Sequence, residues 1–146
     1  TQSYVTEFMR GLHVHCEKKK VILFGMQNWT SYDNLDFDYL NSMSVHLPSN
    51  YFVDYTNAFV KKVISNFREQ YKTEPDYNAF LGFDVSYYFI SALQKYGTGF
   101  LKNLAEDKFN GIETNYSFRQ YPADSGFENK FVHILKFEDY KLVKAN

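Results

Sequence analysis

The 146-residue sequence has few of the residues that mark several common protein classes. It holds a single cysteine, Cys16, which excludes an internal disulfide. No apolar run reaches the roughly 20 residues that a membrane-spanning helix needs. The formal net charge is −1, and the run Lys18, Lys19 and Lys20 is too short to form a basic patch. Nucleic-acid binding therefore has no electrostatic support.

The motifs of common enzymes are also missing. There is no Gly-x-Ser-x-Gly elbow, no P-loop and no Gly-x-Gly-x-x-Gly. The carboxylate pairs Asp36/Asp38 and Glu138/Asp139 lie in turn-like stretches, whereas paired acid–base catalysis needs one buried member. We predict a non-enzymatic protein that uses no cofactor.

A metal site is not expected either. His13 and Cys16 share one face of a helix, but His15 points elsewhere. Zinc sites take four ligands, usually as two compact pairs, and the sequence offers no second pair.

Aromatic residues are abundant instead. Fifteen Phe, thirteen Tyr and one Trp make up 20% of the chain. A core built from rings accounts for most of them. A ligand-binding cleft lined by ring faces is the alternative interpretation for the remainder.

The hydrophobic pattern predicts an α/β protein. Apolar residues at three- and four-residue steps indicate a helix over residues 3–18, and the apolar run 21–25 is typical of a strand buried on both faces in a parallel sheet. The later elements are a short helix near residues 39–43, a strand at 45–48, helices at 59–71, 77–96 and 99–107, and strands at 116–121, 130–137 and 140–143.

The middle of the chain resembles a known family. Helix 59–71 ends in a tyrosine, Pro75 follows, and the next helix opens with the step Ala79 to Asp84 and ends before Gly97. The tail then carries Gly111, Phe118, Gly126, Asn129 and the run 132–135. This ordered set resembles the C-terminal part of type I periplasmic binding proteins, in the branch of branched-chain amino-acid receptors. It also resembles envelope proteins of Bacteroidetes-type bacteria that carry a LysM module.

The resemblance implies the C-terminal portion of a two-lobed fold, three-layer αβα with a short parallel sheet and an antiparallel hairpin tail. Residues 1–146 would form a single α/β unit, a fragment of a larger ligand-binding domain whose first lobe precedes residue 1. In the family, the segment from Phe59 onward returns to the first lobe and the tail ends in the second, so the fragment would hold parts of both.

The function implied by the resemblance is non-catalytic binding of a small polar, amino-acid-like molecule in a cleft between lobes. ABC-type uptake would add a membrane transporter as partner, in the periplasm or cell envelope of a Gram-negative bacterium. The family often uses an acidic residue to contact the ligand's amino group, where this chain has Gln27 and Asn28. An envelope interaction scaffold with a degenerate fold and no small-molecule ligand is therefore the alternative.

The candidate ligand-binding residues follow predicted strands. Gln27, Asn28 and Trp29 come directly after the strand 21–25, at the end where open α/β sheets bind ligands. The simpler interpretation of these residues is a purely structural loop between a strand and a helix, in which Trp29 packs against its neighbours.

A second set is less specific. Ser49, Asn50 and Tyr51 follow the second strand, where a hinge turn is the simpler interpretation. Phe80 aligns with an aromatic near the family's ligand, although a core position on an apolar helix is favoured. Asp84 lies on the same helix, and we expect backbone donors or a Lys to satisfy its carboxylate.

The helix over residues 77–96 is apolar on nearly every face, so each face must pack against other apolar residues to be shielded from water. We expect the isolated fragment to form a homodimer. Phe80, Phe83, Tyr87 and Tyr88 should contribute to the chain–chain contact or to an unusually exposed patch.

Overall fold

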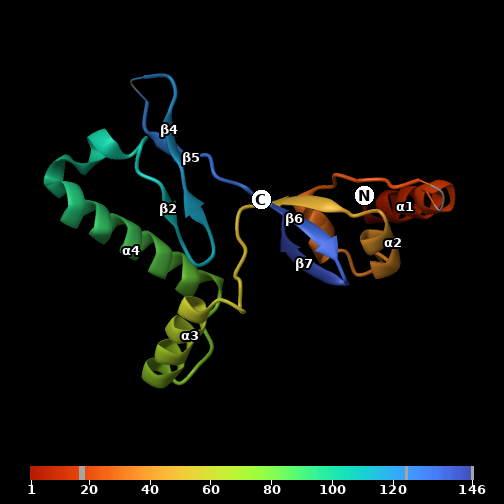
Figure 1. Cartoon of the computed structure of the whole chain (residues 1–146), viewed down its shortest axis with the longest axis horizontal. Coiled ribbons are helices and arrows are strands. Elements are labelled where there is room, and N and C mark those ends of the chain that lie inside the picture. The colour runs from red at the N-terminus through yellow and green to blue at the C-terminus, as the bar shows by residue number, and fades with distance from the viewer. Residues whose placement is uncertain (17–18, 124, 146) are drawn as a thin grey trace. The chain divides into compact units, whose positions relative to one another are not determined.

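The computed structural model describes residues 1–16, 19–123 and 125–145, and it contains two compact units. Unit 1 is made of Thr1–Ser49 and His133–Asn146, and unit 2 is Asn50–Val132 (Figure 1). The predicted helix end at Lys18 and position 124 of the predicted turn lie outside the described residues.

Unit 1 combines helices with a small sheet. Its helices are α1 (Gln2–Cys16), the 3₁₀ turn η1 (Gln27–Ser31) and α2 (Phe37–Ser42). The sheet has the order β1 (His46–Ser49), β6 (His133–Glu138) and β7 (Lys141–Lys144), with both pairs antiparallel. The α/β class is therefore confirmed.

The predicted parallel strand at residues 21–25 is reduced to one parallel bridge, between Phe24 and His46. The His46 N–H donates to the Leu23 carbonyl at 2.7 Å, and the Gly25 N–H donates to the His46 carbonyl at 2.9 Å. Leu23 packs against the core, but Phe24 is 69% exposed. The expected burial on both faces is therefore wrong, because side chains of an extended segment alternate and only one face meets the core.

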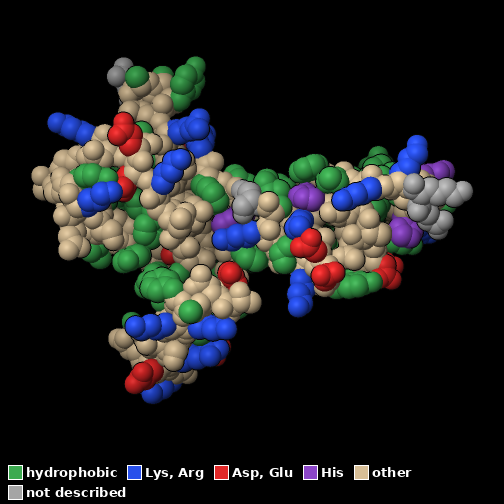
Figure 2. Space-filling view, viewed as in Figure 1, with side chains coloured by type: hydrophobic (Ala, Val, Ile, Leu, Met, Phe, Trp, Pro, Cys, Tyr) green, Lys and Arg blue, Asp and Glu red, His purple; other side chains and the backbone are tan. Residues whose placement is uncertain are grey.

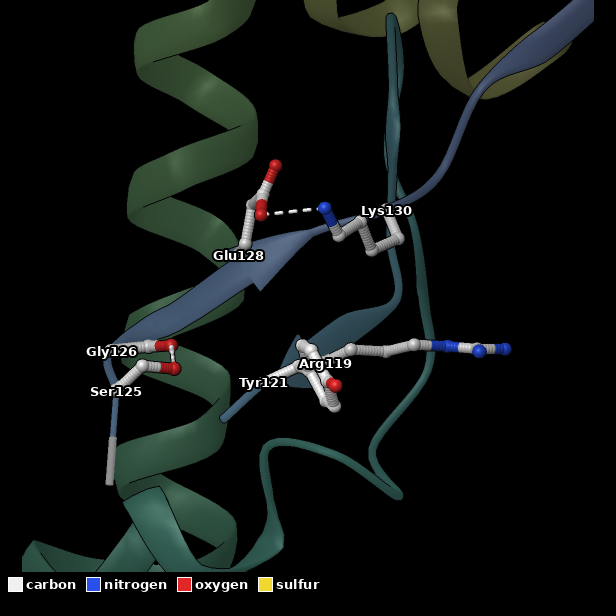
Figure 3. A pocket seen from close by; sticks show the side chains of 6 residues that line it. All are labelled: Arg119, Tyr121, Ser125, Gly126, Glu128 and Lys130. Carbon is white, nitrogen blue, oxygen red and sulfur yellow. Dashed lines mark hydrogen bonds and ion pairs between the residues drawn. The ribbon is translucent and has the colours of Figure 1, made fainter. Parts of the chain in front are cut away.

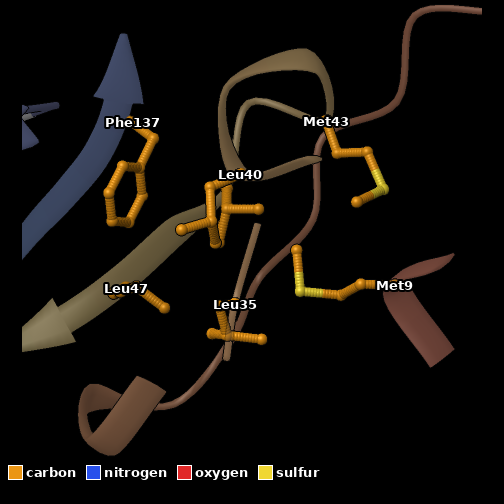
Figure 4. Packing of buried hydrophobic residues seen from close by; sticks show 7 residues of the cluster. Met9, Leu35, Leu40, Met43, Leu47 and Phe137 are labelled. Carbon is orange, nitrogen blue, oxygen red and sulfur yellow. The ribbon is translucent and has the colours of Figure 1, made fainter. Parts of the chain in front are cut away.

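The core of unit 1 joins both parts of its sequence (Figure 4). Its buried residues are Met9, Leu35, Leu40, Met43, Val45, Leu47 and Phe137. Polar contacts tie the β6–β7 turn to α2, since the Tyr140 N–H donates to the Asn41 side chain at 3.3 Å and its hydroxyl donates to Asp38 at 2.8 Å.

Unit 2 is dominated by two helices, α3 (Ala58–Tyr71) and α4 (Tyr77–Tyr96), and the 3₁₀ turn η2 (Gly97–Asn103) follows α4. Side-chain caps fix both helix starts, because Asn57 accepts from the Phe59 N–H at 2.8 Å and Asp76 accepts from the Ala79 N–H at 2.9 Å. Both helices agree with the predicted ranges to within one residue.

Two small hairpins complete unit 2. Strand β2 (Phe109–Asn110) pairs with β3 (Asn115–Tyr116), and β4 (Phe118–Gln120) pairs with β5 (Phe127–Asn129). The predicted strands at 116–121 and 130–137 are thus divided differently: the first is split between β3 and β4, and the second begins later, as β6. Each strand extends only as far as its partner does, which a single strand's composition cannot show.

Helix α4 packs into two clusters of unit 2. Phe80 is 3% exposed and joins Val53, Val60, Ile64 and Ile112. Tyr88 is 1% exposed, and its ring centroid lies 4.9 Å from that of Tyr116.

The predicted exposed patch therefore needs correction. Phe80 and Tyr88 are covered within one chain by α3 and the hairpin segments, and Phe83 is half-buried. Tyr87 is 49% exposed and Ile90 64% exposed, and hydrophobic side chains remain at the surface of both units (Figure 2).

A buried carboxylate organises the loop before β3. Asp84 is fully buried and accepts from the backbone N–H groups of Ile112 at 2.7 Å, Glu113 at 2.9 Å and Thr114 at 3.3 Å. The expectation that backbone donors satisfy it is confirmed. Gly111 is required beside it, because a β-carbon there would collide with the Asp84 carboxylate.

Among the described residues, no helix is both long enough and apolar enough to cross a membrane.

We predict that Asp84→Ala lowers the free energy of unfolding by about 3 kcal/mol, because three buried N–H groups lose their acceptor. Asp84→Asn keeps one acceptor oxygen and should cost less. The matched control is Glu69→Ala, at an exposed position on α3, which should change stability by less than about 0.5 kcal/mol. Urea denaturation measures all three, and an Asp84→Ala loss no larger than the control's would contradict the structural role.

Candidate functional site

Three of the candidate residues lie in η1, directly after the bridged segment. The Gly25 N–H is bound to His46 of β1, and the 3₁₀ turn begins two residues later at Gln27. The backbone N–H of Trp29 donates to the Met26 carbonyl at 3.0 Å, and this hydrogen bond closes the turn. The loop therefore follows the carboxyl end of a segment that runs parallel to β1, where ligands bind in open α/β sheets.

The Trp29 ring lies against the backbone of Gly25. A β-carbon at Gly25 would approach Cζ3 of Trp29 to 2.6 Å and Cδ2 of Leu47 to 2.8 Å. Such distances are far below van der Waals contact, so only glycine fits under the ring. Trp29 is half-buried and packs against the unit 1 core with one part of its surface.

A cavity of about 240 Å³ lies beside Trp29, and its described lining belongs to unit 1. Its lining consists of Trp29, Thr30, Tyr32, Leu35, Phe37, Leu40, Phe137, Tyr140 and Leu142. The hydroxyls are already engaged, since Thr30 donates to the Gln27 carbonyl at 2.9 Å and Tyr140 donates to Asp38 at 2.8 Å. The described lining has no charged side chain, so the cavity suits an apolar group.

Of the predicted ligand residues, Trp29 is the one that the described lining of this cavity contains. Gln27 and Asn28 are exposed beside it, and the Asn28 amide donates to the Tyr32 hydroxyl at 2.9 Å. The two amides are placed on the surface of η1 rather than in the cavity wall.

The second predicted set is divided between the units. Ser49 is buried at the end of β1, opposite His133, while Asn50 and Tyr51 belong to unit 2. The Tyr51 ring meets the Tyr77 ring edge-on at 5.4 Å. Phe80 occupies the unit 2 core, the position that its helix pattern favoured.

Sequence reasoning missed most of the cavity lining. Phe137, Tyr140 and Leu142 enter from the β6–β7 hairpin, far from η1 along the chain. Their strand composition predicted a hairpin, but nothing in it indicated which helix the hairpin would face.

A second hollow, of about 450 Å³, lies on the β4–β5 hairpin of unit 2 (Figure 3). It is lined by Arg119, Tyr121, Ser125, Gly126, Glu128 and Lys130. The Lys130 ammonium pairs with the Glu128 carboxylate at 2.6 Å, and Tyr121 is 92% exposed. These side chains are largely solvated, so the part of the lining that the structure describes has no preorganised polar group.

Burial perturbs the pKa of two titratable groups near the Asp84 loop of unit 2. Burial, together with the nearby Asp84 charge, raises the pKa of Glu113 to about 7. Burial also raises the pKa of Tyr116 to about 12. The Tyr88 and Tyr116 hydroxyls have no hydrogen-bond partner among the described residues. We interpret this perturbation as a consequence of close packing.

Within the described parts of the chain, no group of three or more His, Cys, Asp or Glu could hold a metal ion. His13 instead lies 3.1 Å from the Ser42 hydroxyl, and its ring packs on Tyr39 with centroids 4.5 Å apart.

Comparison with known proteins identifies solved structures with a similar fold. No family model and no curated protein matches the chain. A protein from Rhodospirillum rubrum, assigned to a branched-chain amino acid ABC transporter, has a similar structure, with a TM-score of 0.53 and 15% identity over 99% of this chain and 42% of that one. An ABC transporter substrate-binding protein from Desulfitobacterium hafniense, in complex with Leu, gives a TM-score of 0.45 and 16% identity, over 95% of this chain and 39% of that one.

The similarity to the R. rubrum structure supports the fold and no more. The chain spans 39% and 42% of the lengths of the two structures, and its fold is similar to that of part of the R. rubrum protein. The α/β prediction agrees with it. Neither protein is described as carrying a LysM module, so that part of the resemblance stays a prediction.

We predict that Gly25→Ala displaces the Trp29 ring and lowers stability by about 1–3 kcal/mol, since the added methyl group overlaps both Trp29 and Leu47. Trp29 is the only tryptophan, so its fluorescence spectrum reports the displacement directly. The matched control is Gly11→Ala in α1, where nothing lies within 4 Å of a new β-carbon. That variant should be stabilised by up to about 1 kcal/mol with an unchanged spectrum.

We also predict a pH effect of Glu113. Its folded pKa of about 7 lies above the ordinary value of 4.5, so between these values the unfolded chain releases the proton while the folded chain keeps it. The contribution of Glu113 to stability is therefore full below pH 4.5 and declines up to pH 7. Glu113→Gln should remove this decline. The difference in unfolding free energy between the two proteins, measured from about pH 4 to 8, tests the effect. A constant difference would show that the pKa of Glu113 is ordinary.

Proposed function

We propose that this chain is part of a solute-binding protein that holds a small, amino-acid-like molecule for uptake by an ABC-type transporter. The fold supports this proposal, since the similar R. rubrum structure is assigned to a branched-chain amino acid ABC transporter. The remaining lobe would come from sequence preceding residue 1. The native location would be the periplasm or cell envelope of a Gram-negative bacterium.

The observation that carries the proposal is the cavity beside Trp29. It lies next to the post-strand loop, which is where this type of fold binds ligands. At about 240 Å³ it is smaller than the range of about 300–1,000 Å³ for drug-sized ligands, so it suits a single small molecule.

The chemistry of the walls favours an apolar side chain on the ligand. Rings from Trp29, Phe37 and Phe137 are part of the described lining, which carries no charge. A branched aliphatic group would bury its surface there without desolvating an ion. The exposed amides of Gln27 and Asn28, at the adjoining surface of η1, are the groups that would meet the polar end of the ligand.

One observation favours the alternative function, an interaction scaffold without a ligand. The structure places no charged residue in the described lining to hold the amino and carboxylate groups of an amino acid. The scaffold interpretation requires the cavity to stay empty in the presence of amino acids.

We predict that millimolar leucine shifts the NMR signal of the Trp29 indole N–H and raises the melting temperature. A ligand at a hundredfold excess over its dissociation constant adds about 2.7 kcal/mol to stability. Aspartate and lysine should have little effect, because their charges would be buried in an apolar cavity.

A matched pair of variants locates the site. Thr30→Arg places a long charged side chain at the cavity and should abolish the leucine effect, while Ser31→Arg changes an exposed neighbour that does not line it and should preserve the effect. If no branched-chain amino acid perturbs Trp29 or the melting temperature, the scaffold function is correct instead. If both variants bind leucine normally, the ligand binds elsewhere.

A further inference from the structure

The step from Asn110 to Gly111 is the only Asn-Gly pair in the sequence. An asparagine followed by glycine is prone to spontaneous deamidation, because glycine has no side chain to hinder the approach of its backbone nitrogen to the asparagine amide. The Asn110 side chain is exposed at the end of β2, where water reaches it. The pair therefore supplies both groups that this modification requires.

The reaction needs no co-reactant other than water. The Gly111 nitrogen loses its proton and bonds to the side-chain carbonyl carbon of Asn110, while the bond from that carbon to the amide nitrogen breaks and ammonia leaves. Water then opens the resulting imide ring at either of its carbonyl carbons. The product is aspartate or isoaspartate, and in isoaspartate the main chain contains an additional carbon atom.

The folded hairpin holds the Gly111 nitrogen away from this reaction. Asn110 is paired with Asn115 of β3, and the Gly111 N–H donates to the Thr114 carbonyl at 2.9 Å. The proton that must leave is therefore hydrogen-bonded, and the planar peptide bond keeps the nitrogen directed at Thr114. Rotation of this peptide would move Gly111, which lies so close to the Asp84 carboxylate that no β-carbon fits between them.

Asp84 also fixes the rest of this loop. Its fully buried carboxylate accepts from the backbone N–H groups of residues 112–114, at 2.7, 2.9 and 3.3 Å. Gly111 cannot turn toward the Asn110 amide unless the loop leaves the carboxylate. The reactive geometry thus requires a local opening that breaks several buried hydrogen bonds, and such openings are rare in a folded protein.

Deamidation after such an opening is not reversed when the loop closes. The new side chain is a carboxylate, which adds a negative charge next to the loop that the Asp84 charge holds. Isoaspartate also lengthens the main chain of β2, so the register in which Phe109 lies opposite Tyr116 is lost. The modified loop therefore closes less readily, and the change accumulates in chains that have opened.

We propose that Asn110 is a site of spontaneous deamidation, and that its rate is set by the opening of the loop that Asp84 holds. The modification is a permanent chemical record of that opening. The site lies within unit 2 and is independent of the proposed ligand, since neither Asn110 nor Gly111 belongs to the described lining of the cavity beside Trp29.

Peptide mass spectrometry of the full chain, incubated in mildly alkaline buffer, measures the reaction. The native protein should deamidate at Asn110 about a hundredfold more slowly than the same chain in urea, because the three hydrogen bonds to Asp84 contribute about 3 kcal/mol and each 1.4 kcal/mol changes the opened population about tenfold. Asp84→Ala should remove most of this protection. Asn110→Ser has no amide to lose and should give no signal at this position.

Two further variants separate loop opening from a general loss of structure. Asp84→Asn keeps one acceptor oxygen, so it should remain folded by circular dichroism and deamidate at an intermediate rate. The matched control, Glu69→Ala, changes an exposed position on α3 and should react at the native rate. The proposal is overturned if native and urea-unfolded chains react equally fast, if Asn110 stays intact in urea, or if folded Asp84→Asn reacts no faster than Glu69→Ala.

The effect of the modification is tested on the purified isoaspartate form. Asn110→Asp is its matched comparison, because it adds the same charge without lengthening the main chain. The isoaspartate form should unfold at a lower urea concentration than Asn110→Asp. Equal unfolding of the isoaspartate form and the unmodified protein would show that the hairpin tolerates the longer chain, and that closing of the loop is not impaired.

Discussion

The pairing of β1 with β6 is the constraint on which the rest of this structure depends. It joins segments that lie on either side of the whole of unit 2, with Leu47 opposite Leu135 and Ser49 opposite His133. Unit 2 is therefore an insertion whose two ends start from adjacent residues of one sheet. Such an insertion is tolerated because the entropy of closing a loop grows only with the logarithm of its length. Burial of Leu135, and of Phe137 within the unit 1 core, stabilises the closure.

Within unit 2, Asp84 is the residue that joins segments distant in the sequence. Its carboxylate connects the middle of α4 to the loop 112–114, and that loop leads into the strand carrying Tyr116. The ring of Tyr88, one helical turn beyond Asp84, then packs on Tyr116. One helix thus orients both hairpins, first through charge-assisted hydrogen bonds and then through ring contacts. Raising the pKa of Glu113 is a consequence of the same burial.

The candidate site follows from how unit 1 is assembled. The segment before η1 pairs with β1 on one side only, so its remaining backbone groups face outward. The loop that follows positions Trp29 over Gly25, and the β6–β7 hairpin supplies the other walls of the cavity.

The sequence by itself determined helices α3 and α4 and the satisfied state of Asp84, whereas the helix predicted at 99–107 is the 3₁₀ turn η2. Helix hydrogen bonds join residues that are four apart in the sequence. The apolar stripes and the caps at Asn57 and Asp76 are therefore sufficient to predict helices α3 and α4. Tertiary structure alone decided the strand pairing, the division of the rings between core and surface, and the cavity walls. Phe80 and Tyr87 lie on the same apolar helix, yet one is buried and the other exposed. The residues that cover such a side chain come from segments that are distant in the sequence. The composition of a strand does not indicate which of these segments will pack beside it.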